Sequence, residues 1–123
     1  MRLVLTLLLI AHGVAHLPGF LVAWGLASFP ELPYRTTVFG TVDVGRLGAR
    51  TLGVGWLVMG LLFVALGAAV AFRIELPTAL LPLALGVSAA LCVAAWPDAR
   101  FGFAANTVIA AALVGGERFG LLL

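Results

Sequence analysis

The chain has 123 residues, of which 63% are hydrophobic and 10% are charged. Seven basic and five acidic side chains give a formal net charge of only +2, and the mean hydropathy is +1.21. A soluble domain carries about 25% charged residues, so this chain has too few to cover a water-facing surface. The composition excludes a soluble enzyme, a nucleic-acid-binding module and a disordered tail as the main interpretation, and it predicts an integral membrane protein.

Four apolar stretches are long enough, or nearly long enough, to cross a bilayer as helices. A hydrocarbon core of about 30 Å needs about 20 helical residues. The expected spans are about 3–27, 47–72, 77–96 and 101–120, and the last is free of charge only up to Gly116. We predict a single all-α domain, 1–123, that forms a four-transmembrane-helix bundle. The first stretch exceeds the usual length of a signal-peptide core, so we expect it to be an uncleaved anchor.

The charged residues fall almost entirely in the connections between these spans. The longest connection, 28–46, contains Pro30 and Pro33, which predict an extended or turning segment. Thr41 and Asp43 follow where the second helix is expected to begin. Candidates for ion pairs near the span ends are Asp43, Arg46, Arg50 and Asp98. The arginines divide three against four between the two sides, which leaves the orientation in the membrane open.

The sharpest feature of the first span is a pair of histidines, His12 and His16. A spacing of four places both imidazoles on one helix face, and His12 is expected near the middle of the bilayer. Ionisable groups at that depth are costly and usually face a bundle interior, a cavity or a partner. Pro18 cannot donate to the carbonyl of Val14, so Pro18 and Gly19 predict a kink beside the pair.

Several roles for this pair stay open. A metal site would need further ligands, and none has motif spacing, so we assign no metal. A haem needs ligands on opposite sides of its ring, which two histidines on one helical turn cannot supply unless a symmetric dimer shares the haem. A quinone-like molecule or a lipid head group could bind the pair by hydrogen bonds, and a proton relay could use it. Equally, the histidines could be neutral and simply join helices through hydrogen bonds.

Other spans carry a few polar or small residues that could meet the histidines or pack helices. Candidate ligand-site residues besides the pair are Trp56, Ser88, Cys92 and Asn106. The single cysteine excludes an intrachain disulfide framework and a cysteine-based metal centre. Glycines seven residues apart in the second span, which let a neighbouring helix approach closely, are Gly53, Gly60 and Gly67.

The segment Leu9–Phe20, with its His-Gly and Gly-Phe pairs, resembles the end of the first helix of DoxX-like membrane proteins. Leu52–Gly67 is similar to the glycine-rich second helix of that family. The resemblance implies a small bacterial inner-membrane protein of four helices, from a family sometimes associated with quinone-linked oxidoreductases. An acidic residue usual in the family's second helix is replaced here by Trp56 or a neighbour, so its role is not carried over.

Since no catalytic constellation accompanies the histidines, the sequence favours a non-catalytic role. We expect an accessory or assembly subunit, or a binder of a small apolar ligand or lipid, in a multi-pass inner-membrane protein. The first alternative is a redox component that binds quinone or a haem shared across a dimer, and the second is an oligomeric transporter or proton channel. The expected partners are the lipid bilayer and either a larger membrane complex or further copies of the chain.

Overall fold

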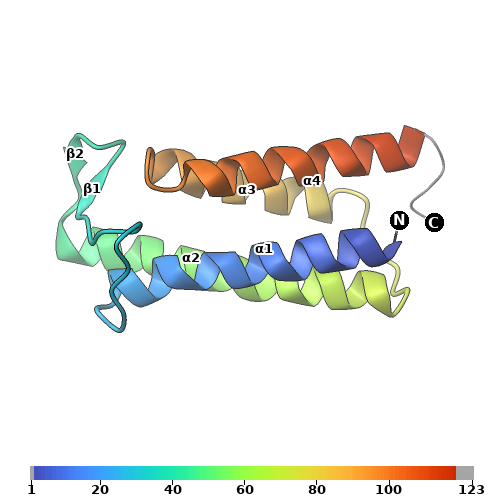
Figure 1. Cartoon of the computed structure of the whole chain (residues 1–123), viewed down its shortest axis with the longest axis horizontal. Helices are drawn as coiled ribbons and strands as arrows, with labels where there is room; N and C mark the ends of the chain where they lie inside the picture. Colours follow the sequence, from blue (N-terminus) through green and yellow to red (C-terminus); the bar gives the residue numbers. More distant parts are fainter. Residues whose placement is uncertain (1, 119–123) are drawn as a thin grey trace.

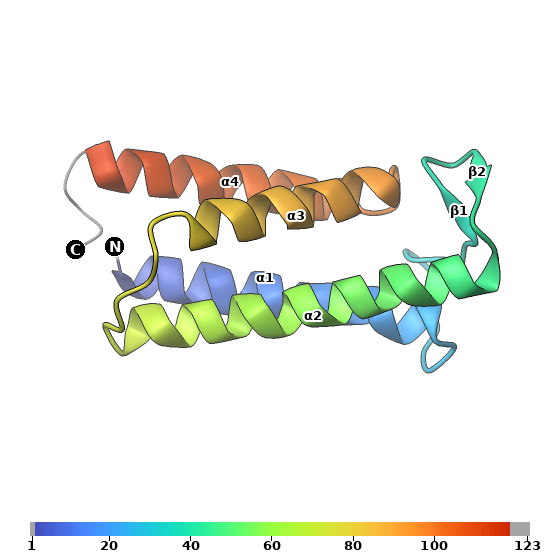
Figure 2. The ribbon, with the colours of Figure 1, turned by 180° about the vertical axis from the view of Figure 1, so that it is seen from behind.

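Two long helices and two shorter ones form the molecule in the computed structural model, which describes residues 2–118. The helices are α1 (Arg2–Ala23), α2 (Gly45–Ala71), α3 (Leu80–Ala94) and α4 (Arg100–Arg118). Helix α1 begins and α4 ends at one end of the bundle, while the connection between α1 and α2 and the turn between α3 and α4 lie at the other (Figure 1). From behind, α2 extends past the shorter α3 at both ends (Figure 2).

The prediction of four helices is confirmed, and two of them are long and apolar enough to cross a membrane. These two are α1 and α2, with mean hydropathies of 1.8 and 2.3 over their most apolar windows. The other two apolar helices, Leu80–Ala94 and Arg100–Gly116, are shorter. Helix α3 begins three residues later than the start of the expected third span, because a turn that joins Leu80 N–H to the Pro77 carbonyl precedes it.

The connection between α1 and α2 contains a β-hairpin that the sequence did not predict. Strands β1 (Thr37–Val38) and β2 (Val42–Asp43) pair antiparallel, with Val38 opposite Val42. The two residues at the tip, Phe39 and Gly40, have φ angles of 55° and 71°, as a type I′ turn requires. Phenylalanine is uncommon in this left-handed conformation, which explains why the turn was not recognisable.

Polar contacts at this end of the molecule differ from those expected. Asp43 accepts a hydrogen bond from the backbone N–H of Gly45 at 2.8 Å, where α2 begins. Within residues 2–118 it forms no ion pair with Arg46, since its carboxylate serves the helix start instead. Arg50 stacks over the ring of Trp24, 5.0 Å from its centroid, and Asp98 pairs with neither Arg46 nor Arg50.

Helices α1 and α2 lie in backbone contact along their length. A Cβ atom added at Gly13 would lie 2.6 Å from the carbonyl oxygen of Gly60, and one added at Gly60 would lie 2.9 Å from that of Gly13. Gly53 lies against Ala23, and Gly67 lies against the first half of α1 in the same way. The structure therefore places all three glycines of the predicted series against α1, where any side chain would force the helices apart.

Along the bundle, the hydrophobic core and the hairpin lie on opposite sides of the histidines. Its buried members come from all four helices, and they are Leu5, Leu9, Met59, Phe63, Leu66, Ala84, Leu85 and Ile109. The histidines therefore lie at the boundary between this core and the hairpin end of the bundle.

Candidate functional site

The six residues proposed from the sequence as a ligand site come together in the middle of the bundle. They come from all four helices, and the four polar ones are almost fully buried: His12 is 5% exposed, His16 2%, Ser88 0% and Asn106 4%. Buried polar groups need partners, because an unpaired one costs about 1–3 kcal/mol. Here the partners are one another.

Asn106 has an orientation that its neighbours determine. Its side-chain amide nitrogen lies 3.1 Å from the carbonyl oxygen of Gly102, which can only accept, so this nitrogen donates there. The same nitrogen donates to Ser88 Oγ at 2.9 Å. The amide oxygen therefore faces His12 Nε2, 3.0 Å away, and the hydrogen on this bond belongs to the histidine.

His16 has an equally determined tautomer. Its Nδ1 lies 2.7 Å from the backbone carbonyl oxygen of His12 and must donate to it. In a neutral imidazole the other nitrogen then accepts, so Ser88 Oγ–H donates to His16 Nε2 at 2.8 Å. The hydrogen bonds close into a ring: His12 to Asn106, Asn106 to Ser88, Ser88 to His16, and His16 back to the His12 carbonyl. Two neutral imidazoles satisfy every step of this ring.

No charge is needed to explain the arrangement. Among residues 2–116, whose side chains the structure describes, the ion pair is that of Arg35 and Asp98, so no carboxylate of these residues lies within ion-pair distance of either imidazole. The two rings instead meet each other edge to face, with centroids 4.6 Å apart. Phe63 of α2 packs against both, at 4.8 Å from His12 and 5.3 Å from His16. Phe63 therefore forms an apolar wall on the α2 side of the histidine pair.

Trp56 and Cys92 contact different members of the ring of hydrogen bonds. The Trp56 ring lies 5.3 Å from that of His16, and it fills the space beside Gly19, where a Cβ would come within 2.7 Å of the indole. The Cys92 thiol is buried, with its sulfur 3.7 Å from the amide nitrogen of Asn106. Helix α1 continues through Pro18 as far as Ala23, so the expected kink does not end the helix.

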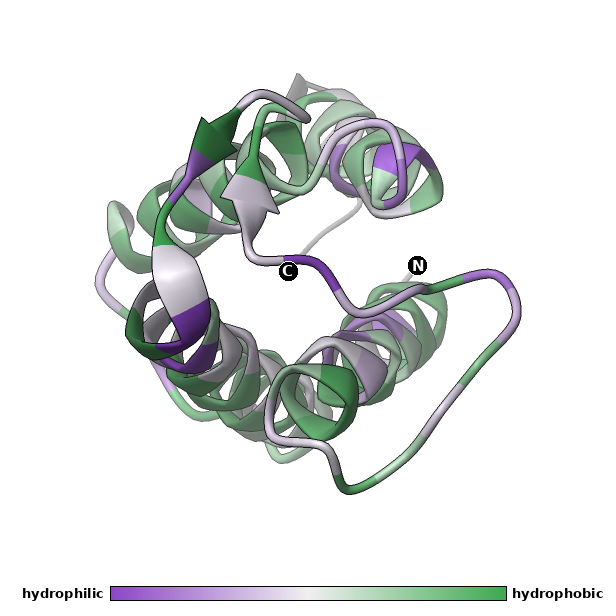
Figure 3. Cartoon of the chain, turned by 90° about the vertical axis from the view of Figure 1, so that its left-hand side faces the viewer, coloured by the Kyte–Doolittle hydropathy of each residue, from purple (hydrophilic) through white to green (hydrophobic). Residues whose placement is uncertain are grey.

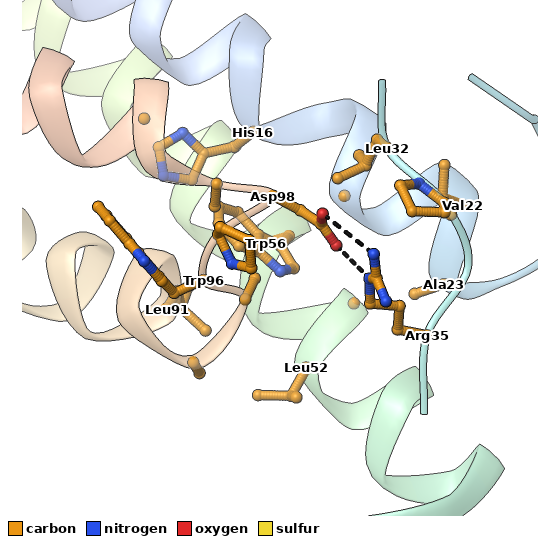
Figure 4. Close-up of a pocket in the computed structure, with 18 of the residues that line it drawn as sticks. His16, Val22, Ala23, Leu32, Arg35, Leu52, Trp56, Leu91, Trp96 and Asp98 are labelled. Atoms are coloured by element: carbon orange, nitrogen blue, oxygen red, sulfur yellow. Dashed lines mark hydrogen bonds and ion pairs between the residues drawn. The ribbon is translucent and has the colours of Figure 1, made fainter. Parts of the chain in front are cut away.

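A cavity of about 450 Å³ opens beside the histidines toward the hairpin end. Both histidines and Trp56 line it, and so do residues of the α1–α2 connection and of the α3–α4 turn. Figure 4 shows His16 and Trp56 together on its inner side, with Leu52 and Leu91 on the walls. The volume lies within the range of about 300–1,000 Å³ that is usual for small-molecule sites.

An ion pair between two connections lies at the mouth of this cavity. The Arg35 guanidinium contacts both carboxylate oxygens of Asp98, which joins the α1–α2 connection to the α3–α4 turn (Figure 4). A backbone hydrogen bond of 2.8 Å from Phe39 N–H to the Ala94 carbonyl ties the hairpin to the end of α3 nearby. The connection therefore covers the cavity and is held in place by one ion pair and one backbone hydrogen bond.

Two parts of the site were missed from the sequence. Phe63 follows Trp56 by seven residues, so the helical repeat could have placed both rings on the face toward α1. Asp98 is an ion-pair candidate from the sequence, but Arg35 is not among its expected partners, and no spacing predicts their contact, since 63 positions separate them.

Metal or haem ligation through His16 would disturb the ring of hydrogen bonds. Within the described part of the chain, no three side chains of His, Cys, Asp or Glu gather in a way that could hold a metal ion. Both nitrogens of His16 already have partners, so ligation through His16 would break one of these bonds.

Comparison of the chain with protein-family models, with curated proteins and with solved structures finds no match.

Proposed function

We propose that this chain is a four-span integral membrane protein that binds a small apolar ligand in the cavity beside His12 and His16, without catalysing a reaction. The observation that carries the proposal is the distribution of polarity. Polar side chains are buried at the centre, and large apolar side chains are exposed on the outside of all four helices.

The exposed apolar residues follow the whole length of the bundle. On the four helices in turn they include Leu3, Leu7 and Val14; Leu47, Val58 and Leu61; Leu83, Val87 and Val93; and Phe101, Val108 and Val114. Seen from the hairpin end, the helices carry mostly hydrophobic residues, and strongly hydrophilic ones gather in the connections and at helix ends (Figure 3). A surface of this kind suits a lipid environment, because the exposure of so much apolar surface to water is unfavourable.

Helices α1 and α2 are long enough to cross a bilayer, whereas α3 is shorter than its hydrocarbon core. At about 1.5 Å per residue, α1 and α2 reach about 33 Å and 40 Å, whereas the 15 residues of α3 reach only about 22 Å. Short spans are accommodated by local thinning of the bilayer and by flanking residues. Trp24 and Trp96 lie at or just beyond the ends of their helices, at the depth where tryptophan usually meets the head groups.

The cavity favours binding over catalysis. Apart from the hydrogen-bonded ring, its inner walls are apolar and aromatic. The Ser88 hydroxyl donates to His16 Nε2, but it is fully buried and also accepts from Asn106, and in the described part of the chain no carboxylate lies within ion-pair distance of either imidazole to orient it as a base. Such a site suits an apolar molecule that carries a polar group. We also propose, on the resemblance of the first two helices to DoxX-like proteins, that the chain is a bacterial inner-membrane protein that serves as an accessory subunit.

A cavity-filling variant tests the proposal. Ala105 lines the cavity, whereas its neighbour Ala104 is exposed on α4 and does not. We expect native mass spectrometry of the protein extracted from membranes in mild detergent to detect a retained lipid-like molecule. Ala105→Phe should lose most of this molecule, and Ala104→Phe, the matched control, should keep it. Recovery of the unaltered protein in the soluble fraction, or equal retention by both variants, would contradict the proposal.

A further inference from the structure

We infer that the cavity selects ligands that carry a hydroxyl group, which donates a hydrogen bond to Nδ1 of His12. This inference rests on the proposed function, because it specifies the ligand class of the same cavity. It follows from the distribution of hydrogens in the ring that joins His12, Asn106, Ser88 and His16.

Every N–H of the two neutral imidazoles is already committed. His12 uses its one hydrogen at Nε2 for the amide oxygen of Asn106, and His16 uses its one hydrogen at Nδ1 for the backbone carbonyl of His12. The Ser88 hydroxyl donates to His16 Nε2. The histidine pair therefore has no hydrogen left for a ligand that can only accept, such as a ketone or an ether.

One acceptor remains. His12 Nδ1 has no hydrogen-bond partner among residues 2–116, whose side chains the structure describes. This nitrogen is also accessible. In the described part of the chain, the fully buried polar side-chain atom without a partner is Thr6 Oγ1, so His12 Nδ1, which also has no partner, is not fully buried. The residue itself is 5% exposed and lines the cavity. A ligand that fills the cavity without a donor would leave this nitrogen unpaired in an apolar site, which weakens binding.

A hydroxyl group suits the rest of the cavity better than another donor does. Trp56 and Tyr34 line the same space and carry an N–H and an O–H, to which a hydroxyl oxygen can offer its lone pairs. An ammonium group could donate to His12 but could accept nothing. The fitting class is therefore an apolar alcohol, a phenol or a hydroquinone, rather than the oxidised quinone.

A pair of probes that differ in one hydrogen-bond donor tests the inference. The chain has two histidines, so nitrogen NMR of histidine-labelled protein in detergent can assign both tautomers. We expect His12 to carry its hydrogen on Nε2 and His16 on Nδ1. Addition of para-pentylphenol should shift the His12 Nδ1 resonance and the indole N–H resonance of Trp56. The methyl ether of the same phenol should shift Trp56 alone and bind about tenfold more weakly.

Two variants complete the test. His12→Gln keeps an N–H near the position of Nε2 but has no acceptor at the position of Nδ1, so the preference for the phenol over the ether should disappear. Thr51→Val, which removes an exposed hydroxyl bonded to the Leu47 carbonyl, should leave the preference unchanged. If His12→Gln does not fold, the two probes on the unaltered protein still decide the matter.

The outcomes separate this inference from the proposed function. Equal binding of phenol and ether, with Trp56 shifted and His12 Nδ1 unmoved, would overturn the inference and leave the binding function intact. A His12 tautomer with its hydrogen on Nδ1 would also overturn the inference. If neither probe shifts Trp56, the cavity does not take up apolar molecules, and both proposals fail.

Discussion

Helix α1 contacts its neighbours in two different ways. Toward α2 it presents Gly13, whose backbone touches that of Gly60 with no side chain between them. Toward α3 and α4 it presents His12 and His16, whose contacts are hydrogen bonds with a cavity beside them. The contact between α1 and α2 has no space for a ligand. In the contact of α1 with α3 and α4, polar side chains lie between the helices and hold their backbones apart. The comparison indicates that the cavity, which is the proposed binding site, lies where polar groups rather than glycines determine the spacing of the helices.

The largest expected effect comes from breaking the glycine contact. In Gly13→Ala, the new Cβ would lie 2.6 Å from the Gly60 carbonyl oxygen and 2.9 Å from the Val64 backbone nitrogen. Because backbone atoms cannot move aside without shifting a helix, the free energy of unfolding should fall by about 2–3 kcal/mol. Titration with sodium dodecyl sulfate, followed by circular dichroism, measures this change.

The matched control for that variant is Gly86→Ala on α3. A Cβ added at Gly86 meets nothing within 4 Å, and alanine favours a helix over glycine by up to about 1 kcal/mol. This variant should be neutral or slightly more stable than the unaltered protein. Equal losses in the two variants would show that glycine contact is not what holds α1 to α2.

A smaller effect is expected from removing the centre of the polar contact. Asn106→Leu keeps the branching at Cγ but removes both polar atoms, which leaves the His12 N–H without its acceptor and Ser88 without one of its donors. The free energy of unfolding should fall by about 1–2 kcal/mol, in line with a lost buried hydrogen bond. The same titration measures it.

The neighbouring Thr107 provides the control for Asn106. Its hydroxyl donates to the Phe103 carbonyl on the exposed side of α4, away from the cavity. Thr107→Val should change the free energy of unfolding by less than about 0.5 kcal/mol. If Asn106→Leu were equally harmless, the ring of hydrogen bonds would contribute nothing to the assembly of α4 with α1.

The contacts of this molecule differ in how far the sequence could predict them. Glycines spaced by seven in an apolar helix predict a close neighbour, and the few strongly polar residues of the spans, His12, His16, Ser88 and Asn106, predict contacts with one another because polar groups in an apolar bundle need partners. The contact of Arg35 with Asp98 was not predictable, because it depends on how a hairpin folds across a distant turn. That hairpin has Phe39 in a conformation usually reserved for glycine or asparagine, so its turn left no signal in the sequence.

The smallest effect on stability is expected from Arg35→Gln, which breaks the ion pair at the mouth of the cavity. The Arg35 side chain is 51% exposed and that of Asp98 15%, and exposed pairs contribute about 0–1 kcal/mol. The free energy of unfolding should therefore change by less than about 0.5 kcal/mol. Para-pentylphenol should dissociate several-fold faster, because the connection over the cavity then loses its ion pair to the α3–α4 turn and keeps the backbone hydrogen bond from Phe39 to Ala94. Relaxation-dispersion NMR on the Trp56 indole measures that rate. An unchanged dissociation rate would show that the connection does not control access to the cavity. A large loss of stability would show that the contact of α1 with α3 and α4 depends on the connections as much as on the ring of hydrogen bonds.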